Sequence, residues 1–144
     1  MKKERVIRIK DLQTTPEGSD NSETTAMGSL LGSADDYTLI FDEDFGDGMK
    51  SRTSISVRGQ NVASIRRRGA INTDIVMETG KRHSCRYSTP YGDMLIGVYA
   101  RDVYSAMSRR GGQLELNYTV DCNGSLIATK QMIIDVSDRI GETK

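Results

Sequence analysis

Short runs in which apolar and polar residues alternate recur along this chain, and they constrain its fold more than any other feature. Between positions 113 and 121 the apolar members of the alternation are Leu114, Leu116, Tyr118 and Val120. The same period of two recurs over 71–77 and 54–58. Because successive side chains of a strand point to opposite faces, each run predicts a strand of an antiparallel sheet with one buried and one wet face.

Composition favours a sheet over a helical fold. The chain has eight valines, twelve isoleucines and twelve threonines, against eight leucines and seven alanines. Side chains branched at Cβ lose rotamer freedom in a helix but pack well on a pleated surface. No segment carries a convincing helical stripe, and we interpret the weak helical spacing over 98–107 as a strand that bends at Gly97.

Turn residues divide these runs at intervals of about ten residues. Asn123-Gly124 predicts a type I′ hairpin, which needs positive φ at both residues. Thr89-Pro90-Tyr91-Gly92 fits a β-turn with proline in second position. The spacing predicts one all-β domain over residues 1–144, an up-and-down antiparallel barrel of about 8–10 strands. We expect a flexible loop over 14–25 and a tail over 138–144.

Charge and hydropathy exclude several classes of protein. Twenty Lys plus Arg balance twenty Asp plus Glu, which argues against nucleic acid as a partner. The longest nearly apolar run, 94–100, is too short to span a membrane, and no apolar export segment follows residues 1–5. Cys85 and Cys122 are too few for a disulfide framework and lack the spacing of a zinc site. We therefore expect a cytoplasmic protein.

An acidic stretch over 42–47 superficially resembles a calcium-binding loop. Its third ligand position is Gly46, and Thr53 stands where an EF-hand has its bidentate glutamate. We interpret the stretch as a solvated hairpin loop and expect neither a metal nor another cofactor.

The densest chemistry lies in 81–92, where a strand would place His83, Cys85 and Tyr87 on one face. His83 is the only histidine of the chain, and histidine titrates near neutral pH. Residues two apart on one face stand about 6.5–7 Å apart, too far for a direct Cys–His hydrogen bond. Either these are buried side chains with satisfied polar tips, or they line a ligand cavity.

The arginine cluster 66–68 is a second candidate site. In a strand Arg66 and Arg68 point one way and Arg67 the other, so the three do not form one continuous patch. Charge at a hairpin end usually discourages aggregation between strands. An anion-binding patch is the alternative interpretation.

The string from Thr79 to Gly97, including His83, Tyr87 and the turn 89–92, resembles the YwiB-like family of small bacterial proteins of unknown function. The strands at 36–40 and 53–55 and the Asn123-Gly124 hairpin follow in the matching order. The resemblance covers roughly residues 5–136. It implies a single antiparallel barrel similar to lipocalins and other calycins, in a cytoplasmic bacterial setting, and it implies no activity, ligand or catalytic residue.

Three hypotheses about function remain open. The first is a non-enzymatic, lipocalin-like protein that binds a small apolar or amphipathic molecule in its barrel. The candidate binding residues are Met77, His83, Tyr87, Tyr91, Tyr99 and Arg101. The second is a filled barrel that acts structurally or binds a protein partner, including a second copy, through its charged hairpins. The third is a hydrolase-type enzyme with His83 as general acid–base, although no paired carboxylates or metal ligands accompany it.

Overall fold

The computed structural model describes residues 4–59 and 61–138 of the chain, and nearly all of them lie in ten strands. No helix occurs in these described ranges. In chain order the strands are β1 (Glu4–Thr15), β2 (Gly18–Gly32), β3 (Asp36–Asp44), β4 (Lys50–Arg58), β5 (Val62–Gly69), β6 (Asn72–Glu78), β7 (Arg82–Thr89), β8 (Gly92–Ser108), β9 (Gly111–Cys122) and β10 (Ser125–Asp138).

The sheet closes on itself. Each strand pairs antiparallel with the next, and β1 pairs with both β2 and β10. The seam between the first and last strands runs from Arg5 opposite Asp138 to Thr14 opposite Thr129. The up-and-down antiparallel barrel predicted from the alternating runs is therefore confirmed, and closure leaves few strand edges free to aggregate.

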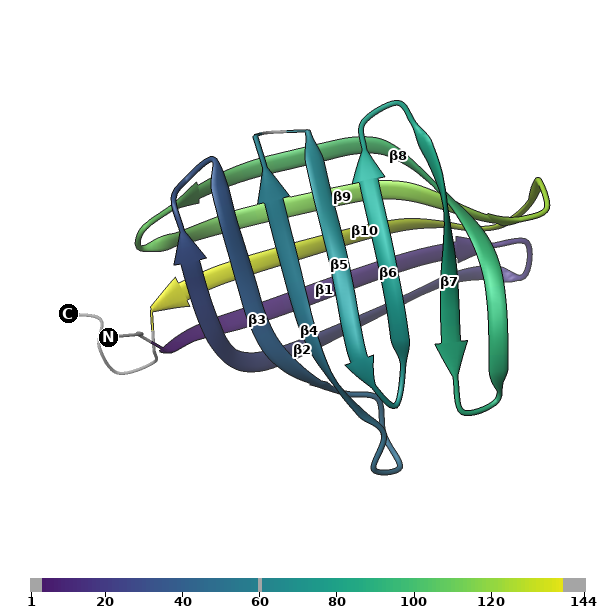
Figure 1. Ribbon diagram of the computed structural model, residues 1–144, viewed down its shortest axis with the longest axis horizontal. Helices are drawn as coiled ribbons and strands as arrows, with labels where there is room; N and C mark the ends of the chain where they lie inside the picture. The colour runs from purple at the N-terminus through teal and green to yellow at the C-terminus, as the bar shows by residue number, and fades with distance from the viewer. Residues whose placement is uncertain (1–3, 60, 139–144) are drawn as a thin grey trace.

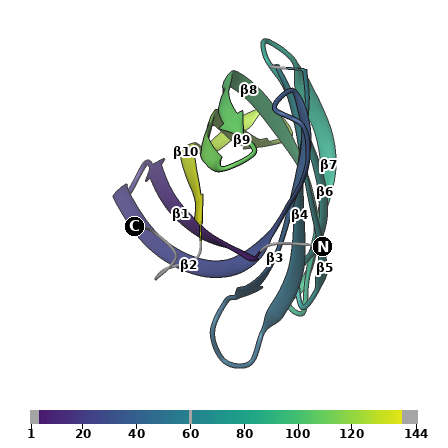
Figure 2. The same ribbon diagram turned by 90° about the vertical axis from the view of Figure 1, so that its left-hand side faces the viewer.

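The barrel is flattened into two layers whose strands cross steeply (Figure 1, Figure 2). β3 to β7 form one layer, and β8, β9, β10 and β1 run lengthwise behind them. The longest strands, β2 and β8, pass from one layer into the other. β8 makes its corner at a bulge at Arg101, which is skipped in the ladder with β9. This irregularity lies four residues beyond Gly97, where the sequence predicts the bend.

The hairpin turns follow their local chemistry. Asn123 and Gly124 both have positive φ, at 54° and 86°, which confirms the type I′ turn. The predicted turn at 89–92 is present, and 15–18 and 108–111 repeat its Ser/Thr-x-x-Gly pattern. In all three the hydroxyl donates to the glycine carbonyl and accepts from the N–H of the third residue. The hydroxyl thus supplies two hydrogen bonds that hold the two-residue loop in its turn conformation.

The loop predicted over 14–25 is wrong. Only Pro16 and Glu17 form a turn, and the remaining residues continue β1 and β2 as a paired hairpin. Both faces of residues 18–25 are exposed, so no alternation marks this strand in the sequence. Asp138 ends β10 and does not begin a tail, and residues 139–144 lie outside the described residues.

Aliphatic side chains fill one part of the barrel interior. The most deeply buried are Ile7, Leu39, Ile55, Ile65, Leu114, Leu116 and Ile134. They belong to β1, β3, β4, β5, β9 and β10, and they alternate with exposed or half-buried neighbours as the sequence predicts. This packed part positions the remaining interior, where side chains do not fill the space.

In two places, adjacent strands of the barrel are hydrogen-bonded over only part of their length. β2 pairs with β3 only through residues 28–32, although it extends ten residues before them. A Cβ on Gly28 would lie 2.4 Å from the carbonyl oxygen of Ile40, so glycine permits the close approach at which the two strands meet. β6 and β7 pair directly only at Asn72 and Thr73. The barrel is therefore tightly closed at the β1–β10 seam and looser at these two places.

Candidate ligand cavity

The unfilled interior is a cavity of about 390 Å³, within the usual range for sites that bind small molecules. Inward-facing side chains of eight strands line it. Its apolar walls include Ile75, Ile96, Val98, Val120 and Met132. Its polar lining includes Asp11, Glu43, Arg67, Tyr87, Tyr118 and Lys130. The cavity thus combines hydrocarbon surface with a few converging polar groups.

A second hollow, of about 540 Å³, lies where β2 separates from the end of β3. It shares Asp11, Glu43, Phe45 and Met132 with the first cavity. Its other lining residues come from β1, β2 and the end of β3, so the two hollows adjoin where β2 and β3 separate.

The charged lining residues continue the apolar alternation of their strands. Arg67 follows Ala63 and Ile65 on β5, and Glu43 follows Leu39 and Phe41 on β3. Each charge is the next inward member of a series whose earlier members are core residues. Strand geometry alone therefore turns these side chains into the barrel.

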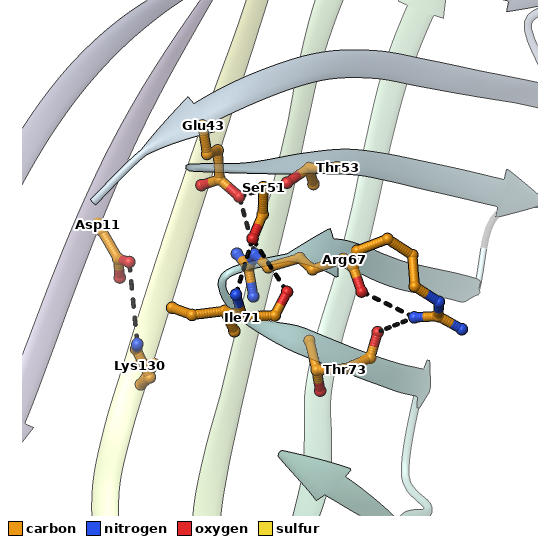
Figure 3. A network of polar contacts seen from close by, with 9 residues as sticks. Asp11, Glu43, Ser51, Thr53, Arg67, Ile71, Thr73 and Lys130 are labelled. Carbon is orange, nitrogen blue, oxygen red and sulfur yellow. Dashed lines mark hydrogen bonds and ion pairs between the residues drawn. The ribbon is translucent and has the colours of Figure 1, made fainter. Parts of the chain in front are cut away.

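Arg67 and Glu43 form a largely buried ion pair, with 12% and 18% of their side chains exposed. Nε of Arg67 donates to Oε1 of Glu43 at 2.8 Å, and the Thr53 hydroxyl donates to the same oxygen (Figure 3). Burial opposes the charge on the guanidinium, but the adjacent carboxylate outweighs burial and raises the pKa of Arg67. Neither Nη nitrogen of Arg67 has a hydrogen-bond partner among the described residues.

Asp11 and Lys130 form a looser pair between β1 and β10. Nζ of Lys130 lies 3.8 Å from Oδ2 of Asp11, beyond hydrogen-bond distance (Figure 3). Oδ1 of Asp11 is buried and has no hydrogen-bond partner in the described part of the chain. Burial raises the pKa of Asp11, and the positive charges of Lys130 and Arg67 reverse only part of that shift.

Two tyrosines complete the polar lining. Tyr118 of β9 is 4% exposed, and Tyr87 of β7 is half-buried. Within residues 4–59 and 61–138 neither hydroxyl has a hydrogen-bond partner, although a buried tyrosine hydroxyl normally has one. Burial and the negative charge of Asp11 raise the pKa of Tyr118, so its hydroxyl is a protonated donor at neutral pH.

Side-chain hydrogen bonds from Ser51 of β4 and Arg68 of β5 hold the backbone at the end of β5 and in the turn to β6. The Ser51 hydroxyl donates to the carbonyl of Ile71 and accepts from its N–H, both at 2.9 Å (Figure 3). Arg68 donates to the carbonyls of Arg67 and Thr73 at 2.7 and 3.2 Å. These contacts fix the end of β5 and so fix the direction in which the Arg67 side chain leaves it.

Of the six binding residues predicted from sequence, the structure places only Tyr87 in the cavity lining. Met77 is buried in the packed core. Tyr91 is 87% exposed in the β7–β8 turn, and Tyr99 and Arg101 are exposed on β8. The structure does not bring these residues together.

His83 lies on β7 away from the cavity lining. Its Nε2 is 3.3 Å from Oε1 of Glu78, and its side chain is 36% exposed. Lys81 and His83 both hydrogen-bond to Glu78 and lower the pKa of that carboxyl. Cys85 is buried, and burial raises the pKa of its thiol, which opposes its use as a nucleophile. The described residues contain no group of three or more His, Cys, Asp and Glu side chains able to hold a metal ion.

The three arginines of 66–68 point to opposite faces of β5, as the alternation of side chains along a strand predicts. Arg66 and Arg68 face outward and both pair with Asp74, while Arg67 faces the cavity. The interpretation of 42–47 as a wholly solvated loop is wrong, because Glu43 lies on β3 and points inward to Arg67. The sequence does contain a signal for Glu43 and Arg67. Each stands two positions after a buried apolar residue of its strand, so the alternation that turns apolar side chains inward also turns these charged side chains inward.

Asp11, Tyr118 and Lys130 are lining residues that sequence reasoning did not select as candidates. Tyr118 stood in an alternating run and was assigned to the core. Asp11 and Lys130 lie in the inward series of β1 and β10, where each follows or precedes aliphatic residues. Only the pairing of β1 with β10 brings these two distant positions together.

The fold and the cavity define a small closed antiparallel β-barrel whose interior is packed in one part and polar in another. Residues 7–134 match the model of a family described as a domain of unknown function (DUF1934), and the chain belongs to that family. The crystal structure of ywiB protein from Bacillus subtilis shares the fold, with a TM-score of 0.85 at 15% identity over 96% of this chain and 93% of that one. The resemblance to the YwiB-like family is thereby confirmed. No curated protein matches the chain. Among the described residues no helix is long and apolar enough to cross a membrane.

Proposed function

We propose that the protein binds a small amphipathic molecule in the cavity of its barrel and does not act as an enzyme. The observation that carries this proposal is the hollow of about 390 Å³ with both apolar walls and converging polar groups. Cavities of this kind are the usual sites of small ligands in proteins. The role is lipocalin-like in the sense that a closed barrel holds its ligand inside.

A cytoplasmic location is part of the same proposal. Cys85 and Cys122 are both free, and Cys85 is buried in the core. Free thiols persist where the surroundings are reducing.

The test uses a neutral fluorescent probe, N-phenyl-1-naphthylamine, whose emission increases in apolar surroundings. Val120 lines the cavity and Val76 lies on the outer face of β6, so the same change at the two positions forms a matched pair. Val120→Phe fills the cavity and should remove most of the probe binding, whereas Val76→Phe should bind the probe like the wild type. Equal binding by all three proteins, or no binding by the wild type, would show that the cavity is not a ligand site.

Self-association is a second candidate function, supported by exposed apolar side chains beside the β9–β10 turn. Leu95 is 65% and Leu126 is 59% exposed, and the Cys122 thiol contacts the carbonyl of Leu95 at 3.9 Å. Exposed apolar groups that lie together often mark protein contacts. Sedimentation equilibrium tests this candidate: a dimer that dissociates in Leu95→Ser/Leu126→Ser would support it, and a wild-type monomer would exclude it.

A further inference from the structure

The hydrogen-bonding groups of the cavity indicate which head group its ligand carries. Among the described residues, the charged and phenolic donors of the cavity lining without a hydrogen-bond partner are the Nη nitrogens of Arg67, Nζ of Lys130 and the hydroxyls of Tyr87 and Tyr118, and the amide of Gln13 adds one further donor group and one acceptor. The charged acceptors without such a partner are oxygens of the two carboxylates. Donors outnumber acceptors, so a complementary ligand head group brings more acceptors than donors.

Tyr118 strengthens this reasoning independently of the charged groups. Its hydroxyl lines the cavity while the residue is 4% exposed. The hydroxyl reaches the cavity space and has no partner among the described residues, so a ligand acceptor can bind it directly. Because Tyr118 lies on β9, away from Arg67 on β5, the two donors approach the ligand head group from different strands.

We infer that the cavity binds an amphipathic monocarboxylate, whose carboxylate lies among the Nη nitrogens of Arg67, Nζ of Lys130 and the hydroxyl of Tyr118. This inference rests on the proposed function and adds the chemical class of the ligand. The hydrocarbon part of the ligand lies along Ile96, Val98 and the other apolar walls. The guanidinium suits this role because its two free nitrogens can bind both oxygens of a carboxylate.

The charges facing Asp11 determine how the cavity accommodates an anion. Lys130 on β10 and Arg67 on β5 are positive, Glu43 on β3 is negative, and the neutral hydroxyl of Tyr118 projects from β9. With Asp11 ionised the four charges cancel. When Asp11 takes a proton from solvent, the cavity gains one positive charge and the unpartnered carboxyl oxygen can become a donor.

This balance selects a monoanion over a dianion. One proton on Asp11 leaves one net positive charge, which a carboxylate neutralises. A phosphate monoester carries more negative charge than that at neutral pH and would leave the cavity negative. Binding of a carboxylate is therefore coupled to uptake of one proton at Asp11.

The first experiment compares octanoate, octanol and octylammonium by isothermal titration calorimetry. The three probes share one chain and differ in head group, so they separate an anion site from an apolar site and a cation site. Octanoate should bind at least about tenfold more tightly than octanol, since charge-assisted hydrogen bonds contribute that much or more. Equal affinity for octanol, or tighter binding of octylammonium, would overturn the inference.

Variants locate the head group. Arg67→Met and Lys130→Met should each reduce octanoate affinity about tenfold or more while changing octanol affinity little. Arg66→Met is the matched control, because Arg66 is adjacent in sequence but faces outward to Asp74. If Arg67→Met fails to fold, Lys130→Met still decides, because Lys130 has only a loose contact with Asp11. Unchanged octanoate affinity in Lys130→Met would contradict the site.

Proton uptake on binding distinguishes a ligand-linked role of Asp11 from a structural one. If Asp11 only supported the fold, octanoate would bind without taking up a proton. Octanoate should bind more tightly as the pH falls from about 8 to about 6, and calorimetry in buffers of different ionisation enthalpy should show net proton uptake. Asp11→Asn, which resembles the protonated side chain, should abolish both effects. Persistent proton uptake in Asp11→Asn would refute the coupling.

The outcomes also separate this inference from the proposed function. If the neutral probe binds and Val120→Phe removes it, but octanoate shows no preference over octanol, the cavity binds ligands without the carboxylate site. If the neutral probe does not bind the wild type, the proposed function itself fails.

Discussion

At the scale of single residues, the Arg67–Glu43 ion pair carries a stability cost. Two charges removed from water attract each other strongly, but the attraction mainly offsets their desolvation. The pair therefore stabilises the barrel little relative to apolar residues of the same size. It is expensive to break, because the remaining charge stays buried without a partner.

Glu43→Gln should accordingly lower the free energy of unfolding by about 3 kcal/mol or more, because it leaves the guanidinium uncompensated. The double variant Glu43→Leu/Arg67→Met should recover most of that loss. Urea denaturation measures both, with an unchanged slope as the sign of an intact fold.

Asp74→Asn is the control for this pair, because Asp74 meets Arg66 and Arg68 at the exposed surface. Surface pairs contribute little, so the change should stay within about 1 kcal/mol. A loss at Asp74 as large as that at Glu43 would contradict the assignment of Glu43 to the interior.

Asp11 gives a prediction with a defined pH dependence. Burial raises its pKa in the folded protein, so the folded state prefers the protonated carboxyl. Its ionisation destabilises the fold fully above the raised pKa, and the penalty disappears below the ordinary pKa of 3.8. Asp11→Asn should therefore be more stable than the wild type at pH 7, and the difference should vanish in acid.

Thermal unfolding at a series of pH values checks this expectation, with Asp20→Asn on the exposed part of β2 as the control. Lower stability of Asp11→Asn at pH 7 would show that the contact with Lys130 outweighs the desolvation of the carboxyl.

At the scale of strands, an arginine spans β7, β8 and β9 on the outer surface. Nε and Nη2 of Arg82 donate to Asp121 at 2.9 and 2.6 Å. The guanidinium lies over Gly97, where an added Cβ would be 2.1 Å from Nη2 of Arg82. Gly97 thus provides the space for a cross-strand ion pair.

Gly97→Ala should lower the melting temperature by displacing the Arg82 side chain from Asp121. The same substitution in an Arg82→Ala background should have little effect, since there is then no guanidinium to displace. Thermal unfolding of the wild type, the two single variants and the double variant, followed by circular dichroism, gives the coupling between the two substitutions. Additive effects would show that Gly97 is needed for another reason.

The stability that the Arg82–Asp121 ion pair contributes also depends on pH. The hydrogen bond from Arg82 lowers the pKa of Asp121 in the folded protein. Its stabilising contribution is present above the ordinary carboxyl pKa and is lost as pH falls through the lowered value. The deficit of Gly97→Ala should therefore shrink in strongly acidic solution.

Local sequence predicts the strands and turns of this barrel well, because a strand repeats every two residues and Asn123-Gly124 suits only a few turn geometries. It fails for residues 18–25, since both of their faces are exposed and only pairing with β1 makes them a strand. It also fails for the cavity. Arg67 and Glu43 lie 24 positions apart, and short-range patterns carry no information about such a contact.

At the scale of the whole molecule, the β1–β10 seam joins the two ends of the chain. Arg5 pairs with Asp138, and their side chains form an ion pair at 3.0 Å. The seam requires contacts of the largest sequence separation in the fold, which delays barrel closure during folding.

A circular permutant that joins Asp138 to Glu4 through a linker and opens the chain between Arg109 and Arg110 tests this. Those residues form an exposed turn between β8 and β9, so the permutant should unfold cooperatively and fold faster than the wild type. Opening the chain between Ser64 and Ile65, inside β5, should prevent folding. Equal folding rates would show that closure of the seam is not rate-limiting.

The barrel interior has a packed aliphatic part and an unfilled polar part, and this division affects how the sequence of such a protein can change in evolution. Rigidity resides where aliphatic groups interlock, and under the proposed function selectivity resides among charges that, as matched pairs, contribute little to holding the barrel together. Mutation can therefore explore new ligands at one end without endangering the other, provided that opposite charges are exchanged in concert. Descendants of one ancestral barrel could in this way keep their architecture while their cargo changes.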